Sequence, residues 1–330
     1  MKKVGLIGCG FMGGCHANCY TSLTDKVKVV AVADVRADFA KEIADKFGAE
    51  IYSDAAQLIE KADVDYVDIC LPTHLHEKYA VMAMKKGLDV FCEKPVCRTK
   101  EEAENLLKVQ KETGRTVQVG QVIRFWNEYV YLKNVKEAGT YGKVVGANFR
   151  RVSPRPAWAW ENWLHTASQS GGMALDFHIH DIDFVRYLLG EPKKITASGV
   201  PEEGGLSDYI HTTYHYDDMV ATAEGCWNYP KDFPFSMSFT VKFEKATIEL
   251  DTKGAFTVYP VDGEKFSPDL GEISVDPSAK GNISSLGGYH TELAYFLDML
   301  DNPEMKNIAS LEEGTRSVVL ALEGIEKAFN

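Results

Sequence analysis

Hydrophobic and polar residues alternate over the first third of the chain in a pattern typical of buried strands separated by amphipathic helices. Short apolar runs such as Val4–Ile7 and Val29–Ala33 precede longer segments in which apolar residues recur at helical spacing. This alternation predicts a parallel sheet with helices on both faces. The predicted strands cover residues 3–8, 27–34, 50–52, 65–71, 88–92 and 116–121, and the predicted helices cover 12–22, 36–47, 75–86 and 99–113.

Beyond about residue 142 the pattern changes to short β-rich runs separated by tight polar turns, with Asp217-Asp218 typical of a hairpin tip. Runs of this kind predict an antiparallel sheet. We therefore expect an α/β chain with a Rossmann dinucleotide-binding domain over 1–122 and an α+β domain with a large, mostly antiparallel open sheet over 123–330. The strands of the second domain are expected over 142–153, 193–200, 208–216, 219–227, 235–243, 245–251 and 254–260, and its helices over 127–138, 172–189, 289–301 and 310–328.

The first predicted strand runs directly into GCGFMG at residues 8–13, which fits the pattern G-x-G-x-x-G. Gly8 permits a tight turn, Gly10 lets the backbone approach a pyrophosphate, and Gly13 lets the following helix pack against the strand. The helix N-terminus offers unpaired N–H groups to the pyrophosphate. The motif, in a strand–turn–helix context, predicts a bound dinucleotide.

Asp34 ends the second predicted strand, 21 residues after the last glycine of the motif. A carboxylate there accepts hydrogen bonds from the adenosine ribose hydroxyls and repels a 2′-phosphate. Arg36 lies close enough in sequence to offset part of that repulsion. The pair predicts NAD as the cofactor, with NADP less favoured.

Composition narrows the class of protein. The formal net charge of −12 argues against a nucleic-acid partner, because phosphate binding needs a basic surface. No apolar run approaches the roughly 18 residues of a membrane span, so we expect no membrane partner and a cytoplasmic location. Three of the seven cysteines, Cys9, Cys15 and Cys19, lie near His16 and raise the question of a metal site. They fall on the nucleotide turn and its helix, so we expect free buried thiols and no structural metal.

Two further clusters carry candidate chemistry. Lys94, in Glu93-Lys94-Pro95, follows the fifth predicted strand, where ligands of open α/β sheets bind. A lysine there can stabilise negative charge on a substrate hydroxyl, although a solvated loop lysine is the simpler interpretation. A tight turn at this point predicts a cis Lys94–Pro95 peptide bond.

The second cluster spans residues 171–183. Its Asp-x-His-x-His order would place three metal ligands on one face of a strand, but the apolar residues repeat at helical spacing. On a helix, Asp176 and His180 share a face and His178 points to the far side. A carboxylate one turn from an imidazole can orient a general base, although an ordinary surface pair remains the alternative.

Four motifs together resemble the Gfo/Idh/MocA oxidoreductases, a family that includes inositol 2-dehydrogenase and glucose–fructose oxidoreductase. They are G-x-G-x-x-G-x-x-H at 8–16, L-P-T-H-L-H at 71–76, E-K-P at 93–95, and G-G-x₃-D-x₃-H-x₂-D at 171–183. The resemblance implies that Lys94, Asp176 and His180 are the catalytic residues. It also implies a Rossmann domain followed by a domain whose large sheet often forms the oligomer interface.

The resemblance and the position of each motif together give the expected contacts of the cofactor and the substrate. The expected cofactor-binding residues are Gly8, Gly10, Phe11, Met12, Gly13, Asp34, Arg36, Leu71, Pro72, Thr73, His76, Glu93 and Lys94. The expected substrate-binding residues are Arg124, Trp160, Asn162 and Tyr289, of which Trp160 lies among three tryptophans whose faces can stack on a sugar or simply pack. The chain departs from the family at His178, where many members have a small residue. It departs from the inositol dehydrogenase pattern at Gln121 and Trp126, which leaves the sugar or polyol open.

These observations predict an NAD-dependent dehydrogenase that acts on a secondary alcohol of a cyclic polyol or pyranose sugar. His180 would remove the hydroxyl proton, Lys94 would stabilise the oxyanion and Asp176 would orient His180. Two alternatives stay open: a glycosidase or lyase that uses NAD for transient oxidation and elimination, and a non-catalytic sugar or NAD sensor.

Assembly is also predicted. The helices of the second domain are too few to cover both faces of its sheet, so we expect one face to be exposed, with Tyr214, Tyr216, Phe239 or Val241 outward depending on register. An apolar face of that size usually marks an interface, which predicts a homodimer or a homotetramer.

Overall fold

The computed structural model describes residues 1–201, 207–271 and 286–329. The chain forms two compact units, one made of Met1–Phe125 and Ile273–Arg316 and the other of Trp126–Glu272 and Ser317–Asn330. The chain first passes from one unit to the other after Phe125, close to the change of sequence pattern near residue 122. The return of residues 286–316 to the first unit was not part of the division expected from the sequence, because periodicity within one helix does not reveal which sheet that helix covers.

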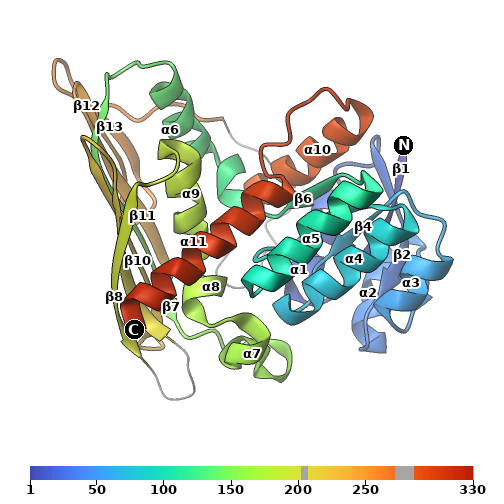
Figure 1. Cartoon of the computed structure of the whole chain (residues 1–330). Helices are drawn as coiled ribbons and strands as arrows, with labels where there is room; N and C mark the ends of the chain where they lie inside the picture. Colours follow the sequence, from blue (N-terminus) through green and yellow to red (C-terminus); the bar gives the residue numbers. More distant parts are fainter. Residues whose placement is uncertain (202–206, 272–285, 330) are drawn as a thin grey trace. The chain divides into compact units, whose positions relative to one another are not determined.

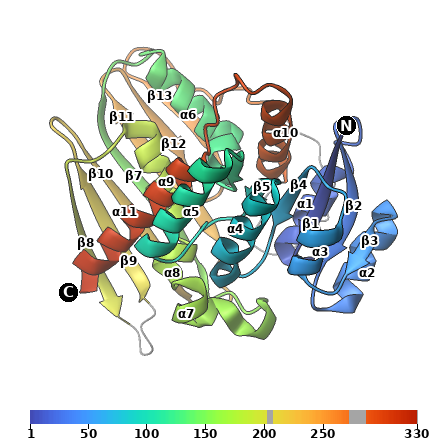
Figure 2. The ribbon, with the colours of Figure 1, turned by 45° about the vertical axis from the view of Figure 1, so that its right-hand side comes forward.

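The first unit is built on six parallel strands in the order β3-β2-β1-β4-β5-β6 (Figure 2). The central strand β1 is apolar and buried from Val4 onward, with Val4, Leu6 and Ile7 inaccessible to solvent. This burial explains why it reads as a continuous apolar run. The strands are β1 (Lys2–Ile7), β2 (Val27–Ala33), β3 (Glu50–Tyr52), β4 (Tyr66–Ile69), β5 (Asp89–Cys92) and β6 (Val117–Val119).

Helices connect these strands. The strand order places the crossovers α1 and α2 on one face of the sheet and α3, α4 and α5 on the other. α10, from the C-terminal part of the chain, packs beside α1. Thr99 caps α5 by accepting a hydrogen bond from the Glu102 backbone at 3.1 Å, as its capping box predicts. The helices are α1 (Phe11–Tyr20), α2 (Ala37–Phe47), α3 (Ala55–Lys61), α4 (His76–Lys86), α5 (Lys100–Thr113) and α10 (Gly287–Asp301), with short 3₁₀ turns η1 (Thr73–Leu75) and η2 (Val122–Phe125).

The second unit contains a seven-stranded sheet in the order β13-β12-β11-β7-β10-β9-β8, antiparallel except for the β7–β10 pair. The fold class predicted from the sequence, a Rossmann sheet followed by a mostly antiparallel sheet, is confirmed. The strands are β7 (Val144–Pro154), β8 (Lys194–Pro201), β9 (Ser207–His215), β10 (Val220–Tyr229), β11 (Ser236–Phe243), β12 (Ala246–Leu250) and β13 (Phe256–Pro260).

Helices of this unit cover one face of the sheet (Figure 1). The core beneath them is aromatic: Phe184 and Phe239 pack edge to face against Tyr129, and Phe149 packs edge to face against Phe184. The helical elements are α6 (Asn127–Glu137), η3 (Trp160–His165), α7 (Ala167–Ser170), α8 (Met173–Asp176), α9 (Ile179–Leu189) and the end of α11 (Leu311–Phe329).

The expected orientation of the large side chains on this sheet is wrong. Tyr214, Phe239 and Val241 are at most 2% exposed and lie in the core, and Tyr216 is half-buried. No helix of the described chain covers the opposite face, which carries the alternate residues of each strand, polar and charged side chains such as Glu224 and Arg150 among them. In one such row Thr213 pairs with Thr222, and Thr222 donates a hydrogen bond to Asn148 at 2.7 Å. The bulky residues pack under the helices because that is where they lose the most contact with water.

Two general features complete the description. Within residues 1–201, 207–271 and 286–329, no helix is both long and apolar enough to cross a membrane. All seven cysteines of the chain are described as free thiols, six of them buried and Cys70 half-buried.

Candidate active site

The glycine turn at the end of β1 has the geometry expected of a nucleotide-binding loop. Gly8 has a φ of +91°, and a Cβ atom there would lie 2.5 Å from the Cys70 carbonyl oxygen. A Cβ atom on Gly13 would lie 1.9 Å from the Gly8 carbonyl oxygen, so only glycine allows α1 to pack this closely. No described side chain caps the N-terminus of α1, where Gly10 is the N-cap residue. The N–H groups at this end therefore remain available to an anion.

Asp34 lies at the end of β2 and is tied to the glycine turn. Its carboxylate accepts hydrogen bonds from the backbone N–H of Cys9 at 2.7 Å and of Arg36 at 2.8 Å. The Arg36 guanidinium contacts the same carboxylate at 3.2 Å and lies over the Phe39 ring at 3.8 Å. The acid therefore comes with a basic partner, as their spacing suggested.

The segment after β4 also fits a cofactor. Thr73 is 1% exposed, and its hydroxyl has no hydrogen-bond partner within the described residues. A buried hydroxyl of this kind calls for a partner from outside the chain. His76 is buried beside it, with its ring nitrogens 2.8 Å from the Pro95 carbonyl and 2.7 Å from the Leu71 carbonyl. Burial lowers the pKa of His76, although these two carbonyls favour the protonated ring.

Lys94 follows β5 at the carboxyl edge of the same sheet and is half-buried. The Lys94–Pro95 peptide bond is cis, which confirms the prediction. Because β1, β4 and β5 are adjacent, their carboxyl ends bring the glycine turn, Thr73 and Lys94 to neighbouring positions on one edge. The structure thus gathers the residues predicted around the cofactor within the first unit.

A buried polar cluster centred on His16 lies behind this edge. One oxygen of Asp68 lies 2.8 Å from His16 Nδ1, and Oε1 of Glu93 lies 3.2 Å from His16 Nε2. Burial is the largest single influence and would lower the pKa of His16, but Asp68 and Cys70 together outweigh it and raise the pKa well above its usual value. A ring protonated at both nitrogens donates to both carboxylates, and the raised pKa of His16 favours this state.

Glu292 on α10 is the least expected member of this cluster. It is inaccessible to solvent, and neither of its carboxylate oxygens has a hydrogen-bond partner within the described ranges. One of its carboxylate oxygens lies within 4.8 Å of a ring nitrogen of His16 and of a carboxylate oxygen of Glu93, a spacing that would admit a cation. The His16–carboxylate contacts nevertheless have hydrogen-bond lengths, which is the pattern of a hydrogen-bonded network.

The predicted catalytic residues of the second unit lie at a break between two helices. The single helix expected over 172–189 is wrong: α8 ends at Asp176 and α9 begins at Ile179. At the break the His178 N–H donates to the Met173 carbonyl, five residues earlier, at 3.1 Å. The Gly171-Gly172 pair, with φ of +80° at both residues, sets the direction in which α8 starts.

The break separates the two histidines by environment. His178 is fully buried against β9 and β10, with Nε2 3.2 Å from the Thr212 hydroxyl, and burial lowers its pKa to about 3. A Cβ atom on Gly225 would lie 2.8 Å from the His178 ring, so that glycine makes room for it. Asp176 and His180 are half-buried. His180, unlike His178, therefore remains reachable for a substrate.

Of the four predicted substrate-binding residues, two are buried in the first unit and two are exposed in the second. Arg124 is 2% exposed, and its guanidinium binds the Ile308 carbonyl and the Glu313 carboxylate, contacts that account for it structurally. Tyr289 is buried, and its ring lies 6.3 Å from that of His16. Trp160 and Asn162 are exposed in η3, where Asn162 has a φ of +54°. Backbone in this region costs free energy for a residue other than glycine and often marks a functional loop.

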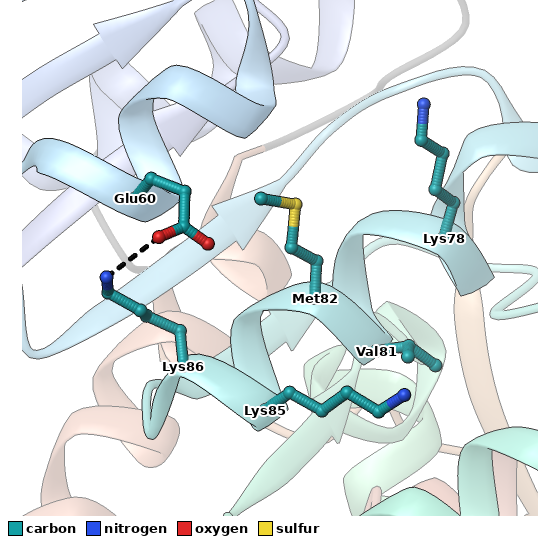
Figure 3. Close-up of a pocket in the computed structure, with 6 residues that line it drawn as sticks. All are labelled: Glu60, Lys78, Val81, Met82, Lys85 and Lys86. Atoms are coloured by element: carbon teal, nitrogen blue, oxygen red, sulfur yellow. Dashed lines mark hydrogen bonds and ion pairs between the residues drawn. The ribbon is translucent and has the colours of Figure 1, made fainter.

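A shallow surface depression lies elsewhere on the first unit, between α3 and α4 (Figure 3). Glu60 and Lys86 pair across it at 2.9 Å. None of the predicted site residues lines it, so it contributes nothing to the candidate active site. Its lining residues are Glu60, Lys78, Val81, Met82, Lys85 and Lys86.

Sequence reasoning missed Asp68 and Glu292. Asp68 stands in the buried run Tyr66–Ile69, and a lone acid in a strand buried on both faces was the available signal. Glu292 occupies the buried face of α10, where an apolar residue would fit the helical period. Both are acidic residues in the interior, where a carboxyl group needs a hydrogen-bonding or charged partner.

Comparison with known proteins decides the family. A family model described as an oxidoreductase family with an NAD-binding Rossmann fold matches residues 2–121, and a GFO/IDH/MocA C-terminal domain model matches residues 129–249. The chain belongs to the GFO/IDH/MocA oxidoreductase family. This confirms the resemblance seen in the four sequence motifs.

Relatives within this family carry several names. Myo-inositol 2-dehydrogenase of Thermotoga maritima is 33% identical over 217 residues, which cover 64% of this chain and 63% of that relative, less than two thirds of its length. Inositol 2-dehydrogenase of Salmonella typhimurium is 30% identical over 81% of this chain and 79% of the relative. A 2,7-anhydro-N-acetylneuraminate hydratase of Escherichia coli is 27% identical over 86% and 77%.

Solved structures of this family share the fold. Levoglucosan dehydrogenase, in a complex with NADH and levoglucosan, superposes with a TM-score of 0.85 over 99% of this chain and 97% of its own. The sequence identity is 21%, so this likeness speaks for the fold alone.

The environment of Glu292 generates a prediction about stability. Burial, followed by the neighbouring Glu93 carboxylate, raises the pKa of Glu292 well above its usual 4.5. The folded state then holds a proton that the unfolded state releases, so this group destabilises the fold increasingly as the pH rises above about 4.5. We expect Glu292→Gln to become more stable relative to the wild type as the pH rises, measured by urea unfolding from about pH 5 to pH 8.

The exposed Glu304→Gln variant is the control and should follow the wild-type pH dependence. A Glu292→Gln curve parallel to the wild type would show that Glu292 is already ionised at neutral pH and would contradict the prediction.

Proposed function

We propose that this chain is an NAD-dependent dehydrogenase that oxidises a secondary alcohol of a cyclic polyol or a pyranose sugar. The observation that carries the proposal is the common edge of the first sheet, where the glycine turn, the orphaned Thr73 hydroxyl and Lys94 follow adjacent strands. Inositol dehydrogenases among the relatives point to the same substrate class.

The glycine turn and the N-terminus of α1 would hold the pyrophosphate, and Asp34 the adenosine ribose. When bound, the nicotinamide supplies the redox chemistry. The protein's part is acid–base and electrostatic: His180 takes the hydroxyl proton, Asp176 orients His180, and the Lys94 ammonium stabilises the oxyanion. The half-buried state of all three side chains supports these roles.

The alternative reaction is cleavage or hydration of a sugar through transient oxidation, with no net change in the cofactor. The hydratase name carried by the Escherichia coli relative is the observation that favours it. Net accumulation of NADH with substrate supports the dehydrogenase, whereas product formation without NADH supports this alternative.

Substrate screening with catalytic variants tests the proposal. Cyclic polyols and pyranose sugars are offered with NAD, and NADH is followed by its absorbance. We expect His180→Asn to lower kcat by about 10²–10⁴-fold, because a positioned base is lost. Lys94→Met should lower kcat by about 10²–10³-fold, because one oxyanion donor is lost. Full activity of either variant on the substrate found would contradict its assigned role.

Cofactor preference follows from Asp34 and is a separate prediction. The carboxylate should make kcat/KM higher with NAD than with NADP, and Asp34→Ser should shift the ratio toward NADP because Arg36 is then released to meet the 2′-phosphate. Asp38→Ser, on the exposed first turn of α2, is the control. A wild-type enzyme that prefers NADP would show that Asp34 does not read the ribose.

The open face of the second sheet is proposed as the interface of a homodimer or a homotetramer. No described helix covers this face, and its polar rows, such as Thr222 and Asn148, can pair across a two-fold axis. Light scattering should give a mass of two or four times 36.7 kDa, and Thr222→Arg on the open face should lower this mass. A wild-type mass of 36.7 kDa at micromolar concentration would contradict this assembly.

A further inference from the structure

A chain of buried hydrogen bonds runs through the first unit from β4 to the backbone of Lys94. Tyr20 donates to Asp68 at 2.8 Å, and Asp68 holds Nδ1 of His16 at 2.8 Å. Nε2 of His16 meets Oε1 of Glu93 at 3.2 Å, and the other oxygen of Glu93 accepts the Lys94 N–H at 3.1 Å. Every link except Lys94 itself is at most 5% exposed.

A histidine that served only to stabilise the core would need no more than its pair with Asp68. Here the second ring nitrogen is also engaged, and the carboxylate it holds is the one that binds the Lys94 backbone. Asp68 thus fixes the orientation of the His16 ring, and the ring fixes one oxygen of Glu93 while leaving the other for Lys94. This series of hydrogen bonds leads to the edge of the sheet at which the candidate cofactor-binding residues lie.

Gly120 shows how closely Glu93 is confined. A Cβ atom at Gly120 would lie 3.0 Å from Oε1 of Glu93 and 3.3 Å from its Cα atom. The backbone of Gly120 has no positive φ, so alanine is conformationally allowed there. The glycine therefore serves to leave space for Glu93.

The charges around His16 favour this arrangement. Glu292 carries no hydrogen bond within the described residues and does not compete with Glu93 for the ring. The charged imidazole lies between two carboxylates in an interior where unpaired charge would be costly. The other titratable groups around it are Cys15, Cys19 and Tyr20 on its own helix, Tyr66 on β4, Cys70 after β4, and Tyr289 with Glu292 on α10.

We propose that His16, oriented by Asp68, is a positioning residue for Lys94 and acts by holding the Glu93 carboxylate against the Lys94 backbone. The inference rests on the proposed function for the role of Lys94 and on the structure for the link between them. His16 touches neither the substrate nor the cofactor in this account.

The test compares His16→Asn, Asp68→Asn and Gly120→Ala with the wild-type enzyme. His16→Asn removes the bridge, Asp68→Asn removes its orienting charge, and Gly120→Ala displaces Glu93 without deleting any charge. Three quantities are measured: kcat with the substrate found by screening, the Kd for NADH by fluorescence, and deuterium exchange in a peptide that contains the Lys94 amide. His215→Asn, a histidine of the second unit, is the matched control.

We expect kcat to fall by about 10- to 100-fold in all three variants, because a small misplacement of a catalytic group has that effect. The Kd for NADH should stay nearly unchanged, and the Lys94 amide should exchange faster. Glu93→Gln should retain more activity than Glu93→Ala, because its carbonyl can still accept from Lys94. The thermal melts of the variants identify any that do not fold, and Gly120→Ala then carries the comparison.

Loss of NADH binding in parallel with kcat would overturn the proposal, since His16 would then shape the cofactor site as a whole. Unchanged exchange at Lys94 in the folded variants would also overturn it. One equivalent of a divalent metal in the purified protein, lost in His16→Asn, would overturn it by making His16 a ligand. Should no substrate be turned over, the proposed function fails, whereas faster exchange at Lys94 would still support the positioning link.

Discussion

The contact of the His16 ring with the carboxylates on either side of it is the interaction on which the candidate active edge of the first unit depends. It joins α1, β4 and the end of β5, which are the three elements that carry the glycine turn, the Thr73 segment and Lys94. Buried charges are tolerated only when they are paired, so each member constrains the place of the others. The network therefore fixes geometry where a mobile loop would otherwise be expected.

Much of this architecture could be predicted from the sequence, because periodicity reports burial. The parallel strands of the first unit are apolar runs in the sequence. The glycines of the turn indicate a backbone conformation that other residues rarely adopt and a close contact that leaves no room for a Cβ atom. Lys94 was found by its place after a strand, and its cis peptide bond by the proline that follows. Each of these signals is local.

The features that could not be predicted are those that depend on distant parts of the chain. Glu292 reaches His16 only because α10 returns to the first unit, and nothing in the periodicity of α10 names its partner. The break between α8 and α9 could not be predicted either. Leu175 and Ile179 lie on opposite sides of the break, yet their spacing is the one that a continuous helix would show. In the second sheet, alternation gave the strands but not which face the helices cover, so the aromatic side chains were assigned outward when they form the core.

The second unit contributes a different constraint. His178 is neutral and locked beneath the sheet, while His180, two residues later, stays within reach of solvent. The helix break and the space left by Gly225 separate a structural histidine from a candidate base. The two units thus use buried histidines in opposite ways, one charged between acids and one neutral beside the Thr212 hydroxyl.

The protonation state of His16 is the point on which this account depends most directly. Nitrogen NMR of protein labelled with ¹⁵N-histidine reports whether one or both ring nitrogens carry a proton, and His16→Asn identifies the signal. We expect a ring that stays protonated at both nitrogens at a pH well above its usual pKa of 6.5, because Asp68 and Glu93 each accept a hydrogen bond from it. A neutral ring at pH 7, with a single protonated nitrogen, would contradict it.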